Sequence, residues 1–171
     1  MITREQAIQM FRSNDLIGIG MEADAVRKRL HPELIVSYSL EGGPEPSPSI
    51  AALHFDGRQT LEERVEELEN LRRVQEETGE LMAVNPSFTG TAVEYLKTLA
   101  VSRIYLDNIS HVQSSPSAAG AKVCQIALRF GANDLGAIGN GPTEEEIRRL
   151  IRDAGFVPKQ RDALFRSLFW N

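Results

Sequence analysis

The sequence predicts an α/β fold with a parallel sheet, and three observations support this prediction. From Ile50 onward, short apolar segments alternate with amphipathic segments four times, which is the order of consecutive βαβ units. Helix signals delimit these amphipathic segments: Thr60 and Glu63 have the spacing of a capping box, and Gly79 is suited to end that helix. The composition is that of a globular protein, with 42% hydrophobic and 25% charged residues among 171.

Residues 1–40 predict two helices and one strand. Thr3 and Gln6 form a capping-box pattern at the start of a helix over residues 3–10. A second helix is expected from about residue 20 to Leu30, because His31-Pro32 follows and disfavours its continuation. Residues 34–40, LIVSYSL, have the β-branched and aromatic composition of a strand.

A segment rich in proline and glycine follows this strand. Residues 41–49 read EGGPEPSPS, and such a segment cannot continue a helix or a central strand. We therefore divide the chain into an N-terminal lead-in with helices and one strand (1–40), a linker (41–49) and a region of βα units with C-terminal helices (50–171).

The region after the linker predicts four strands, each followed by a helix. The strands are expected at residues 50–55, 81–85, 111–115 and 134–139, with Pro86 closing the second strand and the fourth strand being the last. The helices are expected at residues 60–79, 91–106, 118–131 and 142–155, and residues 156–170 are expected to form a further amphipathic helix.

The charge and the hydropathy pattern argue against several classes of protein. A net charge of −5 disfavours a nucleic-acid-binding surface, because phosphate contacts require a basic face. No apolar run approaches the ~20 residues of a membrane span, and the N-terminus lacks the apolar core of a signal peptide. One cysteine, Cys124, allows no internal disulfide and is expected to be a buried, inert thiol. These features predict a cytoplasmic protein.

Several segments carry a resemblance to a known enzyme family. Residues 91–136, TAVEYLKTLAVSRIYLDNISHVQSSPSAAGAKVCQIALRFGANDLG, resemble the dehypoxanthine futalosine cyclases of menaquinone biosynthesis. Those enzymes belong to the radical S-adenosylmethionine (SAM) enzymes and are related to aminofutalosine synthase. The similarity extends to TREQA at residues 3–7, to residues 21–32, to residues 60–79 and to residues 144–166.

The resemblance implies a (β/α)₈ TIM-type barrel in which three cysteines after the first strand hold a [4Fe–4S] cluster. This chain has one cysteine, and residues 41–49 stand where strands one to four and the cluster motif are expected. A full barrel also needs about 250 residues. We therefore expect a partial barrel of four βα units, corresponding to strands five to eight, with no cluster and no other cofactor.

Four βα units cannot close a barrel, so two sheet edges and one apolar sheet face are expected to be exposed. The favoured solution is a homodimer in which four strands from each copy close an eight-stranded barrel. Two alternatives are that the N-terminal helices and the strand at 34–40 cover the opening, or that the chain is an open α/β sandwich.

Barrel enzymes place functional residues at the carboxyl ends of their strands, and polar residues occupy these positions here. The candidates for ligand binding are His54, Asn85, Gln113, Asn133 and Asp134. The resemblance assigns Gln113 and Asp134 to the substrate side of the barrel. Each candidate also has a structural interpretation: a strand histidine is commonly a packing residue, and Asp134 can simply bind backbone amides. No pattern of metal ligands is present.

Three functional hypotheses follow. The first is a degenerate relative of the cyclase, without radical catalysis, which binds a partner or a small nucleoside-like ligand. The second is a SAM-independent enzyme in which Asp134, Gln113 and His54 form an acid–base group. The third is a subunit that completes a split barrel with a chain carrying strands one to four.

Overall fold

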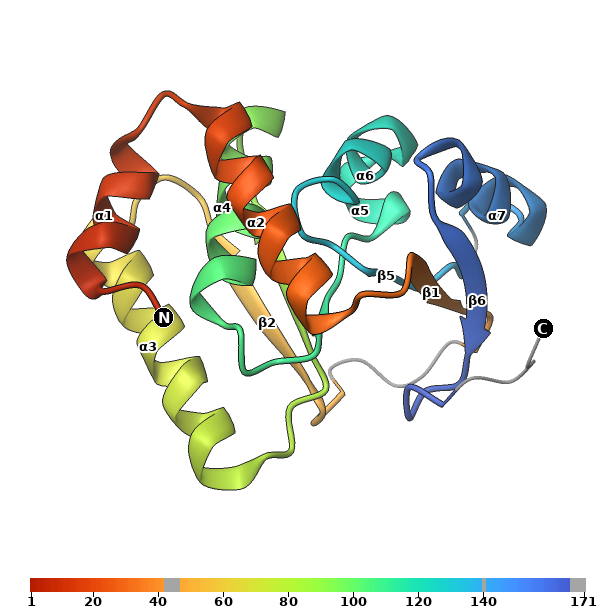
Figure 1. Ribbon diagram of the computed structural model, residues 1–171, viewed down its shortest axis with the longest axis horizontal. Helices are drawn as coiled ribbons and strands as arrows, with labels where there is room; N and C mark the ends of the chain where they lie inside the picture. Colours follow the sequence, from red (N-terminus) through yellow and green to blue (C-terminus); the bar gives the residue numbers. More distant parts are fainter. Residues whose placement is uncertain (42–46, 140, 167–171) are drawn as a thin grey trace.

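The chain forms an α/β structure in which parallel strands alternate with helices (Figure 1). A computed structural model describes residues 1–41, 47–139 and 141–166. The helices are α1 (Arg4–Arg12), α2 (Leu16–Leu30), α3 (Leu61–Thr78), α4 (Ala92–Tyr105), α5 (Pro116–Ala119), α6 (Ala121–Ala127) and α7 (Glu144–Asp153). The strands are β1 (Ile35–Ser39), β2 (Ile50–Phe55), β3 (Ala83–Phe88), β4 (His111–Val112), β5 (Asp134–Ala137) and β6 (Val157–Arg161). The predicted α/β class and parallel pairing are confirmed.

The strands form two three-stranded parallel sheets, in the orders β2-β3-β4 and β5-β1-β6. A parallel bridge between Gln113 and Asp134 connects the end of β4 to the start of β5. The spatial order is therefore β2-β3-β4-β5-β1-β6. In a closed (β/α)₈ barrel the first strand lies beside the eighth. If β5 corresponds to the eighth strand, β1, which pairs with β5, has the position of the first strand. The arrangement is consistent with a partial TIM-type barrel.

The N-terminal strand extends the sheet. One alternative in the sequence analysis was that this strand and the N-terminal helices cover the opening of the partial barrel. β1 pairs with β5 on one side and with β6 on the other. Among the described residues, the sheet region therefore contains two strands beyond the four predicted after residue 50. The 41–49 linker falls largely on residues 42–46, which lie outside the described residues.

The C-terminal region differs from the prediction. Residues 157–161 were expected to belong to an amphipathic helix, but they form β6, which pairs in parallel with β1 over five residue pairs. Consequently β5 is not the last strand. The sequence VPKQR shows no apolar alternation, so the free edge of β1 rather than a local pattern decides this pairing. The apolar end of the predicted helix, residues 168–170, lies outside the described residues.

Smaller differences concern element boundaries. Pro86 lies inside β3 rather than closing it, opposite Leu53 of β2. Because β4 pairs only with Ala83 and Val84, Pro86 has no partner in β4 that would require its missing N–H. The helix predicted for residues 118–131 is divided into α5 and α6 at Gly120, which has a φ of 85°.

The capping boxes predicted at the N-termini of α1 and α3 are confirmed, and α7, which was expected from residue 142, has a third one. Thr3, Thr60 and Thr143 each accept a hydrogen bond from the backbone three residues later and complete a capping box. Gly79 ends α3 in the left-handed conformation. Within the described part of the chain, none of the helices combines the length and apolar character needed to cross a bilayer.

The hydrophobic core lies between the helices and the outer face of the sheet. The central element is α4, whose residues from Tyr95 to Tyr105 are all buried between α2 and β3. The strands contribute the apolar residues Val36, Tyr38, Leu53, Phe55, Val84, Val112 and Leu135 to this core.

The opposite, concave face of the sheet is polar, which corrects the expectation of an exposed apolar face. Cross-strand register places His54 beside Ser87, and Gln113 and Ser37 beside Asp134. Hydrogen bonds join the side chains of each of these pairs. The side-chain period of two in a strand therefore separates an apolar outer set from a polar inner set.

Candidate functional site

The carboxylate of Asp134 is the centre of a buried polar cluster on the concave face. Its Oδ1 accepts hydrogen bonds from Ser37 Oγ at 2.6 Å and from Arg161 Nε at 2.6 Å. Its Oδ2 accepts from Gln113 Nε2 at 2.9 Å, Gly136 N at 2.9 Å and Arg161 Nη2 at 2.8 Å. Arg161 comes from β6, so a residue that the sequence analysis did not consider supplies the charge partner.

This environment keeps Asp134 ionised. Burial by itself raises the pKa of Asp134, but the bidentate hydrogen bonds and the charge of Arg161, with the bond from Ser37, outweigh burial and lower it. With both oxygens occupied, Asp134 is a structural anion that joins β4, β5, β1 and β6. The adjacent Gln113 donates its amide N–H to this carboxylate, and no hydrogen bond is recorded for its Oε1 among the described residues.

Asn133 lies next to this cluster but serves the packing of α4. Its Oδ1 accepts hydrogen bonds from Arg103 Nη2 at 2.7 Å and from Val112 N at 3.0 Å. Its Nδ2 lies 3.2 Å from Nδ1 of His111. Asn133 therefore fixes the start of β4 against α4.

His54 is placed apart from the Asp134 cluster. Its Nδ1 lies 2.7 Å from Ser87 Oγ, and its Nε2 lies 3.2 Å from Thr89 Oγ1. The structure therefore brings Gln113 and Asp134 together, whereas His54 belongs to a separate exposed group at the carboxyl end of β2 and β3.

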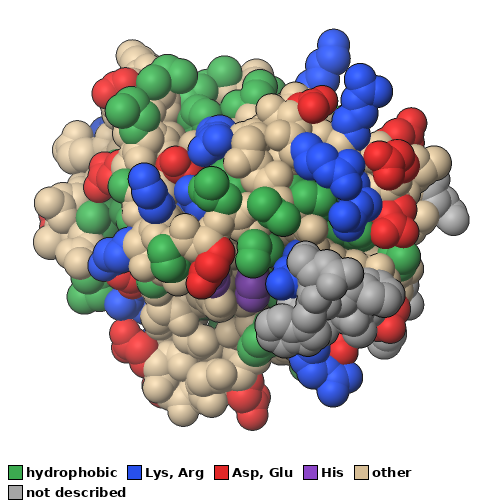
Figure 2. Space-filling model, turned by 45° about the vertical axis from the view of Figure 1, so that its right-hand side comes forward, with side chains coloured by type: hydrophobic (Ala, Val, Ile, Leu, Met, Phe, Trp, Pro, Cys, Tyr) green, Lys and Arg blue, Asp and Glu red, His purple; other side chains and the backbone are tan. Residues whose placement is uncertain are grey.

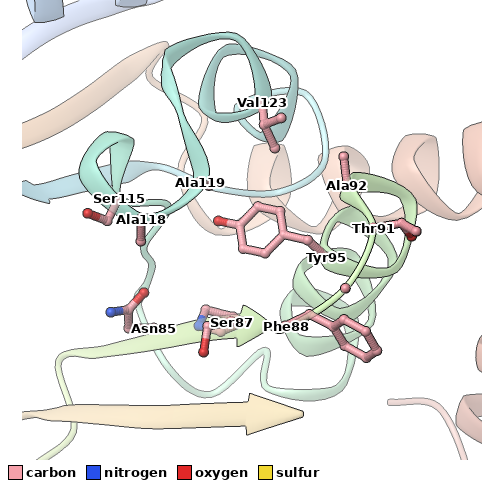
Figure 3. Close-up of a pocket in the computed structure, with 12 residues that line it drawn as sticks. Asn85, Ser87, Phe88, Thr91, Ala92, Tyr95, Ser115, Ala118, Ala119 and Val123 are labelled. Carbon is pink, nitrogen blue, oxygen red and sulfur yellow. The ribbon is translucent and has the colours of Figure 1, made fainter. Parts of the chain in front are cut away.

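A cavity of about 230 Å³ lies beyond the carboxyl end of β3 (Figure 3). Asn85 and Ser87 project from β3 on one side, and the Tyr95 ring extends from α4 across the opposite side. The remaining wall includes Pro86, Phe88, Gly90, Thr91, Ala92, Ser115, Ala118, Ala119 and Val123. Ser115 follows β4, so this cavity occupies the position where barrel proteins bind ligands.

Asn85 is the polar side chain of this cavity with free hydrogen-bonding capacity. Among the described residues, no partner is recorded for either its amide nitrogen or its oxygen, although Asn85 is only partly exposed. A partly buried carboxamide without a partner is suited to bind a donor–acceptor edge of a ligand. Asn85 was expected at the end of its strand, but β3 continues to Phe88, so Asn85 lies inside the strand.

A hydroxyl–thiol chain supports the back of the cavity. Tyr95 Oη lies 2.6 Å from Ser114 Oγ, which donates to Cys124 Sγ at 3.1 Å. Burial raises the pKa of Tyr95 above its ordinary value and raises the pKa of Cys124 to about 11. Cys124 is buried, in agreement with the prediction of a structural thiol. Tyr95 itself was missed because the apolar stripe of α4 gives no sign that its hydroxyl borders a cavity.

The parallel βα units are consistent with a partial TIM-type barrel, in which functional residues are expected at the carboxyl ends of the strands. His54 lies near the carboxyl end of β2, but Asn85 lies inside β3, Asp134 begins β5 and Asn133 precedes it, so these three positions correct the expectation. Residues 73–170 match the family described as CofH/MqnC C-terminal region, and the chain belongs to this family. The predicted relation to the futalosine branch of the radical SAM enzymes is confirmed.

Three relatives illustrate the range of the family. The chain is 30% identical to aminodeoxyfutalosine synthase of Thermus thermophilus over 152 residues, covering 71% of this chain and 41% of that protein. It is 34% identical to cyclic dehypoxanthine futalosine synthase of Streptomyces coelicolor over 134 residues, covering 64% and 34%. It is 32% identical to 5-amino-6-(D-ribitylamino)uracil–L-tyrosine 4-hydroxyphenyl transferase 2 of Methanosarcina acetivorans, covering 85% and 48%. The chain thus spans less than half the length of these relatives.

Proposed function

We propose that this chain binds a small nucleoside-like ligand in the cavity beyond β3 and performs no radical chemistry of its own. The observation that carries the proposal is the free carboxamide of Asn85 facing Tyr95 across that cavity. An aromatic wall with few polar groups is typical of small-molecule sites. The volume of about 230 Å³ lies below the ~300 Å³ at which whole-ligand sites begin, so the cavity suits one ring of the ligand.

The residues present do not fit the family's [4Fe–4S] cluster. Three thiolates are needed, and these 171 residues supply one, Cys124. That thiol is buried and receives a hydrogen bond from Ser114. Among the described residues, no three His, Cys, Asp or Glu side chains lie together so that they could hold a metal ion. Radical chemistry therefore requires ligands from outside this sequence.

An acid–base enzyme is a weaker hypothesis. Asp134 would be its base, but both oxygens of that carboxylate are engaged by Arg161 and its other donors. His54 bonds to Ser87 and Thr89 rather than to Asp134. Ligand binding needs none of these groups to exchange a proton.

The experiment is a titration of the protein with adenosine, in which the amide NMR signals of residues around the cavity are monitored. We expect saturable shifts centred on Asn85 and Tyr95. Asn85→Ala should weaken binding about tenfold, because the variant loses one or two hydrogen bonds of ~1 kcal/mol each. Asn70→Ala is the matched control, since Asn70 is exposed on α3, and it should bind as the parent does.

The proposal would be refuted if adenosine, inosine and guanosine gave no saturable shift up to about 10 mM. This concentration detects Kd values near the weak end of specific binding. The cluster assignment has its own test. Anaerobic reconstitution with iron and sulfide should give no [4Fe–4S] absorbance, and a stoichiometric cluster would contradict it.

A second candidate function is completion of a barrel with further strands. It is supported by β2 and β6, which end the strand order and therefore each have one edge unpaired within the described residues. The added strands can come from a second copy, from another chain or from a longer form of this one. Light scattering at several protein concentrations tests the homodimer. A monomer at all concentrations would exclude completion of the barrel by a second copy.

A further inference from the structure

The described residues after β6 turn back onto the concave face of the sheet. We call residues 162–166 the plug. Asp162 organises it: Oδ1 accepts hydrogen bonds from the backbone N–H of Leu164 and Arg166, each at 2.9 Å, and Oδ2 accepts from Arg166 Nε at 2.6 Å. The backbone N–H of Ala163 donates to Glu41 Oε2 at 3.2 Å.

Phe165 is the residue that the plug inserts. Its ring stacks on the imidazole of His111, with centroids 4.7 Å apart and planes at 25°. The guanidinium carbon of Arg161 lies 3.8 Å from the same ring centroid. Phe165 is thus in contact with one cationic and one aromatic plane, the combination that binds an electron-rich ring.

The residue that the plug inserts has an unfavourable backbone conformation. Phe165 has a φ of 61°, the only positive value among the described residues other than glycine, and such a backbone conformation is unfavourable for a residue with a side chain. Its side chain is half-buried and is not part of the hydrophobic core. Ala163, Leu164 and Arg166 are exposed, and no helix or strand includes them. A segment of this kind opens at low free energy.

Two cavities border the plug and Arg161. One, of about 120 Å³, is lined by Gln113, Gly136, Arg161 and Ala163 among others. The other, of about 370 Å³, is lined by His31, His111, Asn133, Arg161 and Phe165 among others. Figure 2 shows histidine side chains at the bottom of a hollow beside basic side chains. Withdrawal of Phe165 would enlarge the second cavity, whose volume already lies within the ~300–1,000 Å³ range of small-molecule pockets.

We propose that the plug occupies a second ligand site, in which the planar, electron-rich aromatic ring of a small molecule takes the place of Phe165 between His111 and Arg161. The ring of Phe165 marks the position and the plane of the ligand. Arg161 favours an electron-rich ring because its guanidinium is attracted to the ring face. This site is separate from the cavity of Asn85.

Polar groups at the edge of the site add directionality. Asn133 Nδ2 lies 3.2 Å from His111 Nδ1, so Nδ1 accepts and the neutral imidazole carries its proton on Nε2. That N–H is recorded with no partner among the described residues and can donate to a ring substituent. The ring of His31 also stacks on that of His111, with centroids 5.6 Å apart. His31 donates from Nε2 to Ser110 O at 2.6 Å, and this hydrogen bond fixes the ring that packs on His111.

The test uses indole as the probe and cyclohexanol as the non-aromatic control, with the ring proton signals of His111 as the readout. Phe165→Ala removes the internal ring, and Asp162→Ala releases the plug without changing any group that faces the ligand. We expect both variants to bind indole at least tenfold more tightly than the parent, with saturable shifts at His111. Leu164→Ala is the matched control, because Leu164 is 64% exposed in the same segment, and it should bind as the parent does.

Each other outcome overturns the proposal. Equal indole shifts in all four proteins mean nonspecific surface binding. A folded Asp162→Ala protein without a saturable shift at His111 means that the plug is a permanent part of the structure. Cyclohexanol binding equal to that of indole means an apolar space without aromatic selectivity. Because the signals of Asn85 and Tyr95 report the first cavity separately, failure here and failure of adenosine binding are distinguishable.

Discussion

The two faces of the sheet differ in how they are completed. On the outer face, apolar residues such as Val36, Leu53 and Leu135 are fully covered by helices of the same chain. On the concave face, polar residues either satisfy one another, as Asp134 and Arg161 do, or remain available, as Asn85 does. A closed barrel would bury this second face. Among the described residues, a short loop inserts Phe165 into this face.

Asp134 and Leu135 test this contrast because they are adjacent and face opposite sides. Asp134→Asn leaves the guanidinium of Arg161, 5% exposed, without its carboxylate. Loss of one partner from a buried ion pair costs ~3–5 kcal/mol, so we expect this change to be the most destabilising in urea denaturation. Asp153→Asn is the control: its 3.9 Å pair with Arg149 is exposed and should cost at most ~0.5 kcal/mol. A cost below ~1 kcal/mol for Asp134→Asn would show that the cluster does not hold the strands together.

Leu135→Ala measures the outer face. The side chain is fully buried against the helices, so a cavity forms and the free energy of unfolding should fall by ~2–4 kcal/mol. Ile126→Ala is the comparison, because Ile126 is 48% exposed on α6 and should change stability by less than about 0.5 kcal/mol. Similar losses for both variants would contradict the assignment of the outer face as the core.

The concave face should also respond to pH through His111. Burial lowers the pKa of His111 from 6.5 to about 4 in the folded protein. The folded state therefore favours the neutral imidazole, so this contribution to stability is complete above pH 6.5 and is lost as the pH falls toward 4. Its full size is roughly 3 kcal/mol. Denaturation at pH 7 and pH 4.5 should show the loss in the parent protein and less of it in His111→Gln, while an equal loss would assign the effect elsewhere.

Asn85→Ala should have the smallest effect on stability. Asn85 has no recorded side-chain partner in the described structure, so we expect a change below about 0.5 kcal/mol in thermal or urea unfolding. This neutrality distinguishes a residue kept for a ligand from one kept for the fold. A loss above ~1 kcal/mol would mean that Asn85 has a structural partner and would weaken its role in binding.

The helices were the most predictable part of the fold. Thr3 and Thr60 start their helices as the capping patterns indicated, and Gly79 ends α3. These signals are local: a cap involves residues within one helical turn, so the sequence contains the whole interaction. The end of β3 was predicted less well: Pro86 was expected to close the strand after Asn85, but the strand continues to Phe88, because Pro86 lies where β3 has no partner in β4.

The C-terminal region could not be predicted in this way. Residues 157–161 have no pattern of a strand, and they form β6 because β1 offers an unpaired edge. The role of Asp134 was equally hidden, since its partner Arg161 is 27 residues further along the chain. Residue identity alone cannot distinguish a reactive carboxylate from one held in an ion pair.

The sequence by itself determined the α/β class, the capped starts of α1 and α3 and the family, because each depends on short-range patterns or on residue identity. The tertiary structure decided that β1 and β6 extend the sheet, that Asp134 is held by Arg161, and that Phe165 reaches His111. These contacts join distant segments, and their energies depend on which edges and charges remain unpaired once the helices have packed.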